Sequence, residues 1–461
     1  MNLTLIIVII YVSILLLIGF FIKKSIKNID DYVLGGRNIS WFLITASLAA
    51  NDIGAGASIG IVQDAAQNNS FQSVWYIWLM IPSYILGFFV APYIRRTNAR
   101  TVPEYLGKRY NNLAKYLSSL FLVIPNIGII AINLTASASI IQILISTSFI
   151  TALFIAVTVT LVYSYLGGLW ADVITDFIQI VTIIFGLAII LIILFATYPS
   201  IDFKFSRFFD AESISISKNI SLIVLYTTNF IVGLSTSTRI LSSKNELSAK
   251  KGILYCIPLY LIYGIVPVLI GLYLGKYGIK SYELSTIFDF FLNNFPFYIS
   301  SLLFIGIISA SLSTVDTLLL SCSTVIYNDL VEPLNTKVSE LSETKKLASI
   351  RILLVLVTLL SSIIALIGFG NVINFLIGLL ITQSVVVFSP FVFAMFRNIS
   401  DTKSGFISML ISLLTYFILK FNPFCEIQDT FILIPCLVIS MLYLKFKNSD
   451  IEQNIHLKKD S

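Results

Sequence analysis

Residues 309–321 read SASLSTVDTLLLS, a run of hydroxyl groups with one carboxylate inside a longer apolar segment that begins at Phe295. At about 100° per residue, one helix face carries Ser309, Ser313, Asp316, Thr317 and Leu320, flanked by Ala310 and Thr314. A hard cation such as Na⁺ takes several oxygen ligands, and this face supplies them. Single hydroxyls in membrane helices often bond back to the preceding turn or join neighbouring helices. The cluster with its carboxylate, rather than any one member, therefore predicts a cation site.

The composition around this segment is that of a membrane protein. Of the 461 residues, 57% are hydrophobic and 12% are charged, and the mean hydropathy is +0.93. Soluble domains contain about a quarter charged residues. Stretches of about 20 apolar residues can cross a bilayer as helices. We therefore predict an all-α integral membrane protein with about thirteen transmembrane helices, at residues 3–22, 41–63, 73–94, 116–145, 148–167, 172–197, 219–241, 253–275, 296–325, 348–369, 372–396, 404–420 and 429–446.

The basic residues predict the orientation of the chain, because short cytoplasmic loops collect Lys and Arg. With the N-terminus outside and the C-terminus in the cytoplasm, 24 of the 30 basic residues fall in inside segments. This predicts a multi-pass protein of the cell membrane with an odd number of helices. The net charge of +6 then reflects the topology of the loops and implies no nucleic-acid partner.

Ionisable residues at membrane depth mark functional sites by default, because burying them is costly. Three carboxylates qualify, Asp52, Asp176 and Asp316. The topology places every Lys and Arg in a loop or at a helix end, so we expect no protein cation beside these carboxylates. They are either protonated through burial or balanced by a mobile cation, and the hydroxyls beside Asp316 favour the cation.

Two predicted spans contain glycines that permit a helix to unwind. The stretch ASLAANDIGAGASIG (46–60) has three glycines directly after Asp52, and YTTNFIVGLSTSTR (226–239), five spans later, contains Gly233. In transporters with internal repeats, unwound carbonyls coordinate ions and half-helix ends face the substrate. Glycines that only allow close helix packing are the alternative. The matching positions of the two stretches predict a central binding site.

Five segments of this chain resemble the sodium:solute symporter family, and they occur in the family's order over most of residues 30 to 400. These segments are DYVLGGRNISW (31–41), ASLAANDIGAGASIG (46–60), TVPEYLGKRY (101–110), YLGGLWADVITDFIQ (165–179) and ASLSTVDTLLLSCSTVIYNDL (310–330). The resemblance implies a leucine-transporter type of fold and Na⁺-coupled alternating access. On this division, one transmembrane domain contains an extra first helix (1–30), two inverted five-helix repeats (41–197 and 219–396), two extra helices (404–446) and a cytoplasmic tail (447–461).

The resemblance also implies the ligands of the coupling ion. The main Na⁺ site would use the carbonyls of Ala50, Ile53 and Ala310 and the hydroxyls of Ser313 and Thr314. A second cation site or exit route would use Asp176, Asp316 and Thr317 together with Ser313. Asp316 departs from the best-known second-site pattern, which has serine at that position.

The solute is predicted only as a class, a small polar organic molecule. Asp52 matches the proline-transporter branch, but the next residues, Ile53, Gly54 and Ala55, differ from that branch. The hydroxyls and the arginine expected for sialic acid are absent, while IGAGASIG and YLGGLW are closer to the choline-transporter-like branch. An intramembrane acid would favour a cationic amine. Candidate substrate contacts are Asp52, Gly54, Ala57, Trp75, Tyr76, Asn133, Tyr226, Asn229, Thr382 and Gln383.

Other functional classes fit the sequence less well. The single histidine, His456, lies in the polar tail, and no nucleophile and base accompany the carboxylates, so we expect no enzyme. A membrane sensor built on a symporter-like core would be expected to carry a signalling module, and only a short polar tail follows Leu444. A proton-coupled carrier of the same fold stays open as the mechanistic alternative.

Overall fold

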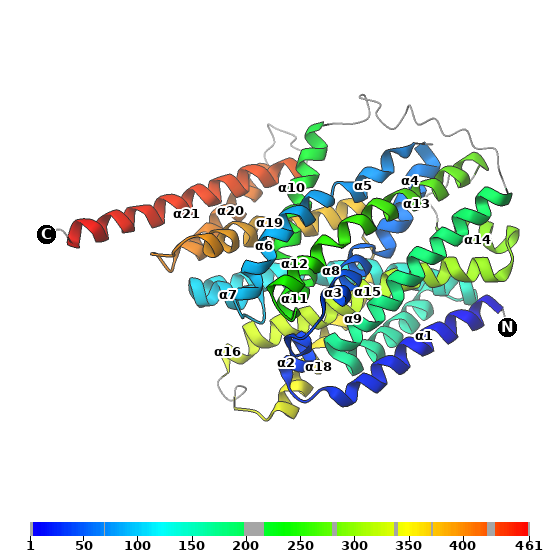
Figure 1. Cartoon of the computed structure of the whole chain (residues 1–461), viewed down its shortest axis with the longest axis horizontal. Coiled ribbons are helices and arrows are strands. Elements are labelled where there is room, and N and C mark those ends of the chain that lie inside the picture. The colour runs from blue at the N-terminus through cyan, green and yellow to red at the C-terminus, as the bar shows by residue number, and fades with distance from the viewer. Residues whose placement is uncertain are drawn as a thin grey trace.

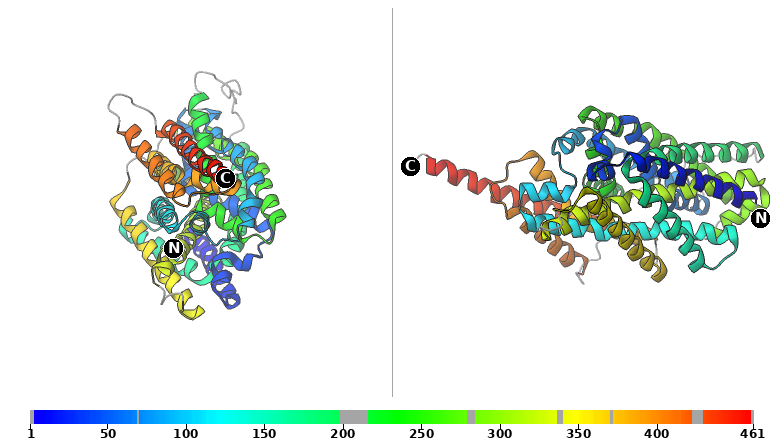
Figure 2. Two further views of the ribbon diagram at one scale, coloured as in Figure 1. Left: turned by 90° about the vertical axis from the view of Figure 1, so that its left-hand side faces the viewer. Right: turned by 90° about the horizontal axis from the view of Figure 1, so that it is seen from below.

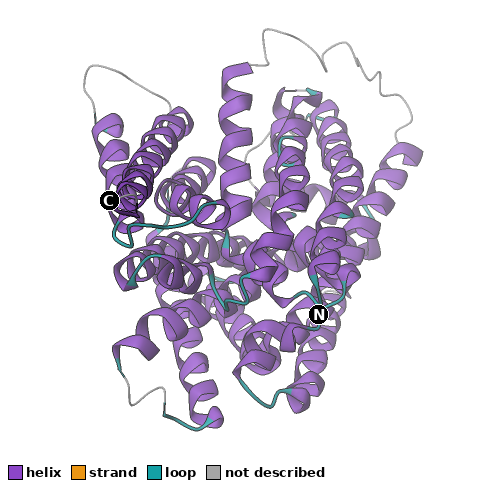
Figure 3. Ribbon diagram, turned by 60° about the vertical axis from the view of Figure 1, so that its left-hand side comes forward, coloured by secondary structure: helices purple, strands orange, loops and turns teal. Residues whose placement is uncertain are grey.

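The computed structural model describes residues 3–68, 70–197, 216–278, 284–335, 340–369, 372–421 and 429–459. Nearly all of these residues are helical, and within these ranges there is no strand (Figure 3). Within these ranges, the backbones of Ile39 and Ser243 form an isolated parallel β-bridge. The prediction of an all-α protein is confirmed.

The helices surround α15 (Phe297–Val325), which contains the hydroxyl-rich stretch (Figure 1). In the apolar 18-residue segment of Phe297–Leu334, the helix that includes α15, 83% of the residues are buried. The corresponding share in α1 (Leu3–Ile22), which lies at the edge of the bundle, is 17%. The other helices of the first half are α2 (Ile29–Leu34), α3 (Trp41–Asp52), α4 (Ala55–Asn68), α5 (Trp75–Trp78), α6 (Ile81–Arg96), α7 (Val102–Arg109), α8 (Asn112–Ile145) and α9 (Phe149–Thr197). Those of the second half are α10 (Ile216–Val232), α11 (Leu234–Ser242), α12 (Glu246–Leu254), α13 (Cys256–Lys276), α14 (Leu284–Asn294), α16 (Glu332–Leu334), α18 (Glu343–Ile367), α19 (Val372–Phe396), α20 (Ser404–Lys420) and α21 (Asp429–Lys459).

The number of predicted spans differs from the number of long apolar helices. Among the described residues, nine helices are long and apolar enough to cross a membrane, or up to ten if the bent pair α10 and α11 is one span. The expected count of about thirteen is not confirmed on this measure for three reasons. The span predicted at 41–63 is split into α3 and α4, the spans predicted at 148–167 and 172–197 run together as α9, and α20 has only 17 residues.

The two ends of the bundle differ in the segments they carry (Figures 1 and 2). α2, α7, α16 and the C-terminal end of the chain lie toward one end, whereas the N-terminal end and α14 lie toward the other. The segments expected to face the cytoplasm therefore gather at one end. α21 continues to Lys459, because residues 447–459 contain no Gly or Pro and extend the last helix into the predicted tail.

Three helix breaks shape the interior. α3 ends at Asp52, and Ile53 leaves the helical conformation with φ −82° and ψ 56° before α4 begins. α10 and α11 meet at Gly233 with a bend of 45°. α9 is kinked at Gly168, whose φ of 55° and ψ of −164° are accessible almost only to glycine.

Replacing Gly168 with alanine tests the kink in α9. An alanine Cβ would lie 2.7 Å from the backbone oxygen of Tyr32 and would impose a strained φ. We expect the variant to lose about 2–3 kcal/mol of unfolding free energy, measured by denaturation of purified protein in detergent. Gly306→Ala is the control, because its Cβ would meet nothing within 4 Å; equal stability of the two variants would contradict the account of the kink.

Candidate functional site

The hydroxyls of α15 meet the end of α3 at the break in that helix. Ser313 Oγ donates to the carbonyl of Ala50 at 2.9 Å, and Thr314 Oγ1 donates to the carbonyl of Asn51 at 3.0 Å. Both hydroxyls also lie 3.2 Å from the carbonyl of Ala310. Five oxygens from two helices therefore form one cluster, deep in the bundle, that we call the α3–α15 oxygen cluster.

This cluster brings together four of the five residues expected at the main Na⁺ site. The fifth, Ile53, is buried at the break, but the carbonyl that Thr314 contacts is that of Asn51, which the sequence did not predict. The unwound segment lies directly against the cluster, since a Cβ on Gly54 would be 3.5 Å from Thr314 Oγ1 and 3.8 Å from Asn133 Oδ1. An alanine Cβ at position 54 would be in ordinary van der Waals contact with these two polar atoms.

A fully buried arginine contacts α15 at Thr317, one turn beyond the oxygen cluster. Arg239 of α11 has no exposed surface, and its Nη2 contacts Asp172 Oδ2 at 2.7 Å and Asp176 Oδ2 at 3.0 Å. Its Nε donates to Ser47 Oγ at 2.7 Å, and Nη2 also donates to the Thr317 hydroxyl. The guanidinium therefore links α11 to α3, α9 and α15.

Arg239 corrects the expectation that no protein cation accompanies the buried carboxylates. The sequence analysis placed this residue at the cytoplasmic end of the predicted span 219–241. In the structure, α11 starts again after the bend at Gly233 and carries the side chain into the bundle. The sequence also missed Asp172, which is 4% exposed. Its spacing of four residues from Asp176 places both on one face of α9 and could have indicated it.

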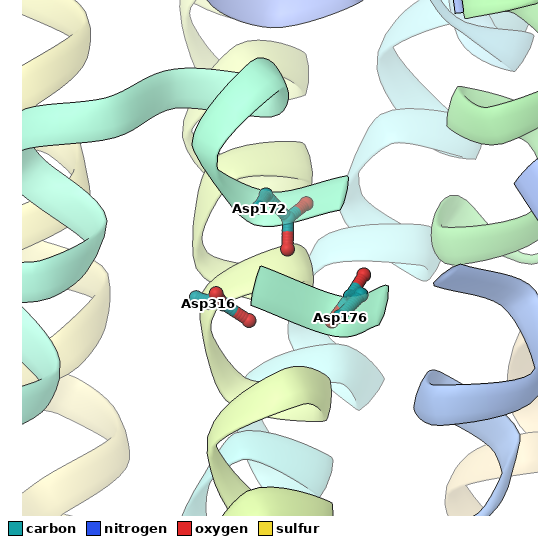
Figure 4. Close-up of side chains that lie close together, drawn as sticks. All are labelled: Asp172, Asp176 and Asp316. Atoms are coloured by element: carbon teal, nitrogen blue, oxygen red, sulfur yellow. The ribbon is translucent and has the colours of Figure 1, made fainter. Parts of the chain in front are cut away.

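Asp172, Asp176 and Asp316 point toward one another (Figure 4). One carboxylate oxygen from each lies within 4.8 Å of the other two. Asp316 Oδ1 accepts from the backbone N–H of Thr317 at 2.8 Å, whereas Asp316 Oδ2 and Asp176 Oδ1 are buried without a hydrogen-bond partner in the described part of the chain. Asp176 Oδ2 also accepts from Ser47 and, at 3.3 Å, from Asn51. Two of the three carboxyl groups, those of Asp172 and Asp176, therefore contact the guanidinium directly, and Asp316 lies beside them.

Asp52 faces a different set of partners. Its Oδ2 accepts hydrogen bonds from Tyr84 of α6 and, at 3.2 Å, from Tyr260 of α13. The two tyrosine hydroxyls are themselves 2.7 Å apart, and the ring of Phe230 packs on Tyr84 at 4.5 Å between centroids. These contacts join the break in α3 to α6, α10 and α13, and no sequence pattern indicated the two tyrosines.

A chain of amides crosses from α10 to α8 through α19. Gln383 donates to Asn229 Oδ1 and accepts from Asn126 at 3.0 Å. Asn229 also donates to Ser384 Oγ at 2.8 Å. Asn229 and Gln383 were predicted as substrate contacts, and the structure places them together as partners of each other; Asn126 was not predicted.

The remaining candidate substrate residues lie on separate elements. Asn133 on α8 donates to the preceding turn, and its backbone carbonyl accepts from Ser311 at 2.7 Å. Thr382 donates to the carbonyl of Leu379 on its own helix. The half-buried aromatic candidates are Trp75 and Tyr76 on α5 and Tyr226 on α10. Ala57 lies on α4, and its side chain is outside the described part of the structure.

Broken helices that meet a cluster of oxygen ligands inside a helical bundle are characteristic of ion-coupled membrane transporters. The model of the sodium:solute symporter family matches residues 32–412, which is most of the chain. The protein belongs to the sodium:solute symporter family. This confirms the resemblance and the prediction of a transporter rather than an enzyme.

Curated relatives and a solved structure agree with this assignment. The chain is 28% identical over 210 residues to Solute carrier family 5 member 4A of Mus musculus, covering 43% of this chain and 31% of that protein. It is 28% identical over 191 residues to the Sodium/myo-inositol cotransporter of Homo sapiens, covering 41% and 27%. The chain thus matches about 30% of the length of these relatives. A substrate-bound, outward-open Na⁺-coupled sialic acid symporter shares the fold, with a TM-score of 0.84, 18% identity and 97% of each chain covered.

Proposed function

We propose that this protein is a Na⁺-coupled secondary active symporter that takes up a small polar organic solute by alternating access. The observation that carries the proposal is the α3–α15 oxygen cluster, in which carbonyls freed at a helix break face two hydroxyls of a buried helix. In an unbroken helix the carbonyls of Ala50 and Asn51 would already accept backbone hydrogen bonds, so the break leaves them more free to face an ion.

The spacing of the oxygens supports a cation ligand set. A cation of the size of Na⁺ or Ca²⁺ holds its oxygens at about 2.3–2.6 Å, so ligands at right angles are about 3.4 Å apart. The contacts of Ser313 and Thr314 are 2.9 to 3.2 Å long, so a shift of a few tenths of an ångström would accept the ion. In this arrangement the hydroxyl protons would turn away and the oxygens would face Na⁺. We retain Ala50, Ile53, Ala310, Ser313 and Thr314 as ligands and add the carbonyl of Asn51.

The driving force follows from the charge of the ion. Each Na⁺ that enters down a potential of 100 mV supplies about 2.3 kcal/mol. This energy would accumulate the solute about fifty-fold, because about 1.4 kcal/mol corresponds to a factor of ten. We propose that the protein lies in the cell membrane with its N-terminus outside and its C-terminus in the cytoplasm. Its two repeats, 41–197 and 219–396, would each begin with a broken helix.

The solute would bind where the broken helices meet their neighbours. We propose contacts from the ten candidate residues named above, with Asp52 and the amides Asn229 and Gln383 as the polar groups among aromatic side chains. The relatives named as myo-inositol cotransporters widen the candidates to include polyols, beside amines, amino acids, sugars and carboxylates.

Uptake into vesicles tests the proposal directly. Purified protein in liposomes should accumulate at least one labelled amine, amino acid, sugar, polyol or carboxylate when a Na⁺ gradient is imposed, and should not accumulate it when K⁺ replaces Na⁺. Empty liposomes are the control. Accumulation that follows a pH gradient and ignores Na⁺ would instead establish the proton-coupled alternative. Na⁺-dependent stabilisation by a solute without any uptake would favour a sensor.

A further inference from the structure

We propose that a cleft between α7 and the end of α19 binds a phosphate-bearing anion, and that the headgroup of an anionic phospholipid is its ligand. The cleft lies at the end of the bundle that carries α7 (Figure 1). It shares no lining residue with the α3–α15 oxygen cluster or with the carboxylates of α9. The inference therefore goes beyond the proposed transport function.

The cleft has the size and the charge that such a headgroup requires. Its volume is about 410 Å³, and it is lined by Tyr105 and Arg109 of α7 and by residues 394–398 at the end of α19. Pockets for small molecules usually measure about 300–1,000 Å³. The described lining contains two arginines, Arg109 and Arg397, and no acidic residue, so the cleft presents positive charge.

The charges of the two arginines are not neutralised by the protein. Neither Arg109 nor Arg397 forms an ion pair with a carboxylate in the described part of the chain. The acidic residues of the neighbouring segments are engaged elsewhere, since Glu104 pairs with Lys108, and Asp401 accepts from a backbone N–H of its own loop. Arginine suits phosphate because its planar guanidinium can donate to two oxygens at once. An anion in the cleft would therefore meet two uncompensated guanidinium groups.

Capping of α19 accounts for only part of this arrangement. A helix C-terminus carries partial negative charge, and here Tyr105 Oη donates to the carbonyl of Ala394 at 2.9 Å while Arg109 Nη2 donates to the carbonyl of Arg397 at 2.6 Å. These two carbonyls are thus occupied by donors. The Nε of Arg109 is buried without a hydrogen-bond partner among the described residues. The side chain of Arg397 is exposed and has no hydrogen bond within the described ranges, so capping gives it no role.

The place of the cleft favours a lipid over a soluble anion. It lies at the end of α19, which is long and apolar enough to cross a membrane, and at the end of the bundle proposed to face the cytoplasm. Beside it, Phe396 is 49% exposed and packs against Tyr93, which is 44% exposed, with ring centroids 5.0 Å apart. Exposed aromatic rings are typical of the membrane interface, and basic pockets at the cytoplasmic ends of membrane helices suit anionic headgroups. The acyl chains would lie along the two rings while the phosphate meets the arginines.

Titration with short-chain lipids tests the inference. The full chain, delipidated in detergent, is mixed with dioctanoyl phosphatidylglycerol, dioctanoyl phosphatidylcholine or glycerol phosphate, and its thermal stabilisation gives the affinity. Phosphatidylglycerol should stabilise the wild type saturably, and the other two should not at the same concentrations. Arg397→Gln and Arg109→Gln should each weaken binding of this lipid by about tenfold or more, as expected for a lost hydrogen bond to a charged group.

Lys345→Gln is the matched control for the two arginine variants. It makes the same change of charge at an exposed position in the first turn of α18, outside the cleft. This variant should bind phosphatidylglycerol as the wild type does. A loss equal to that of the arginine variants would show that only the total charge matters, and it would overturn the site.

The other outcomes separate the source of the phosphate from the existence of the site. Glycerol phosphate that binds as tightly as the lipid, and less tightly in both arginine variants, would support the anion site and overturn the lipid as its ligand. Equal stabilisation by phosphatidylcholine, or undiminished affinity in both variants, would overturn the site. If Arg109→Gln does not fold because α19 loses its cap, Arg397→Gln decides the matter. Failure of Na⁺-driven uptake with lipid binding intact would reject the proposed function alone.

Discussion

Replacing Arg239 with glutamine is expected to lower the free energy of unfolding by about 3–5 kcal/mol, because the change leaves buried carboxylates without their positive partner. Asp172 and Asp176 both contact the guanidinium within 3.0 Å, and neither exposes its charge to water. Denaturation of purified protein in detergent measures the effect, together with the yield of folded protein from membranes. Arg96→Gln is the control, since its ion pair with Glu246 is exposed and contributes about 1 kcal/mol or less.

A second substitution separates charge from packing in this network. The double variant Arg239→Gln with Asp172→Asn removes one charge of each sign, so it should be more stable than Arg239→Gln alone. Non-additivity of about 0.5–3 kcal/mol would be typical of residues in direct contact. If Arg239→Gln is as stable as wild type, the ion pair does not hold α11 against α9. The same conclusion follows if the effects of Arg239→Gln and Asp172→Asn are strictly additive.

Removing either hydroxyl of the α3–α15 oxygen cluster should weaken Na⁺ binding by about ten- to hundred-fold. Ser313→Ala and Thr314→Ala each delete one oxygen ligand, and an interaction with a charged group is worth about 1.5–3 kcal/mol. The measurement is the Na⁺ concentration that gives half of the thermal stabilisation of purified protein, since a bound ion raises stability by mass action.

Thr324→Ala provides the matched control for these variants. Thr324 lies near the end of the same helix, is 7% exposed, and donates only to the carbonyl of Leu320 among the described contacts. Its replacement should leave the Na⁺ dependence unchanged. If Ser313→Ala and Thr314→Ala also respond to Na⁺ as wild type does, the proposed ligand set is wrong.

Local sequence patterns predicted the features that depend on one or two helices. The hydroxyl face of α15 and the glycine-rich stretch after Asp52 indicated a buried polar helix opposite a broken one. The structure shows that contact through Ser313 and Thr314. Gly233 indicated the second break. Helix periodicity and glycine chemistry are properties of neighbouring residues, and a single sequence contains them.

Features that depend on several helices were not predictable in the same way. Arg239 lies near the end of an apolar stretch, where a basic residue normally faces the cytoplasm, and only the bend before α11 turns it inward. Tyr84 and Tyr260 are ordinary aromatic residues of membrane helices until packing brings both hydroxyls to Asp52. Asn126 gains its role from Gln383, which is 257 residues away. Such partners are selected by tertiary packing rather than by sequence spacing.

Direct binding of radioactive Na⁺ to purified wild-type and Ser313→Ala protein tests the central claim, that carbonyls at the break in α3 and hydroxyls of α15 hold the coupling ion. We predict saturable binding to the wild type and an affinity at least about tenfold lower for the variant, with Thr324→Ala binding as the wild type does. Absence of saturable binding to folded wild-type protein, or equal affinities in wild type and Ser313→Ala, would contradict the account.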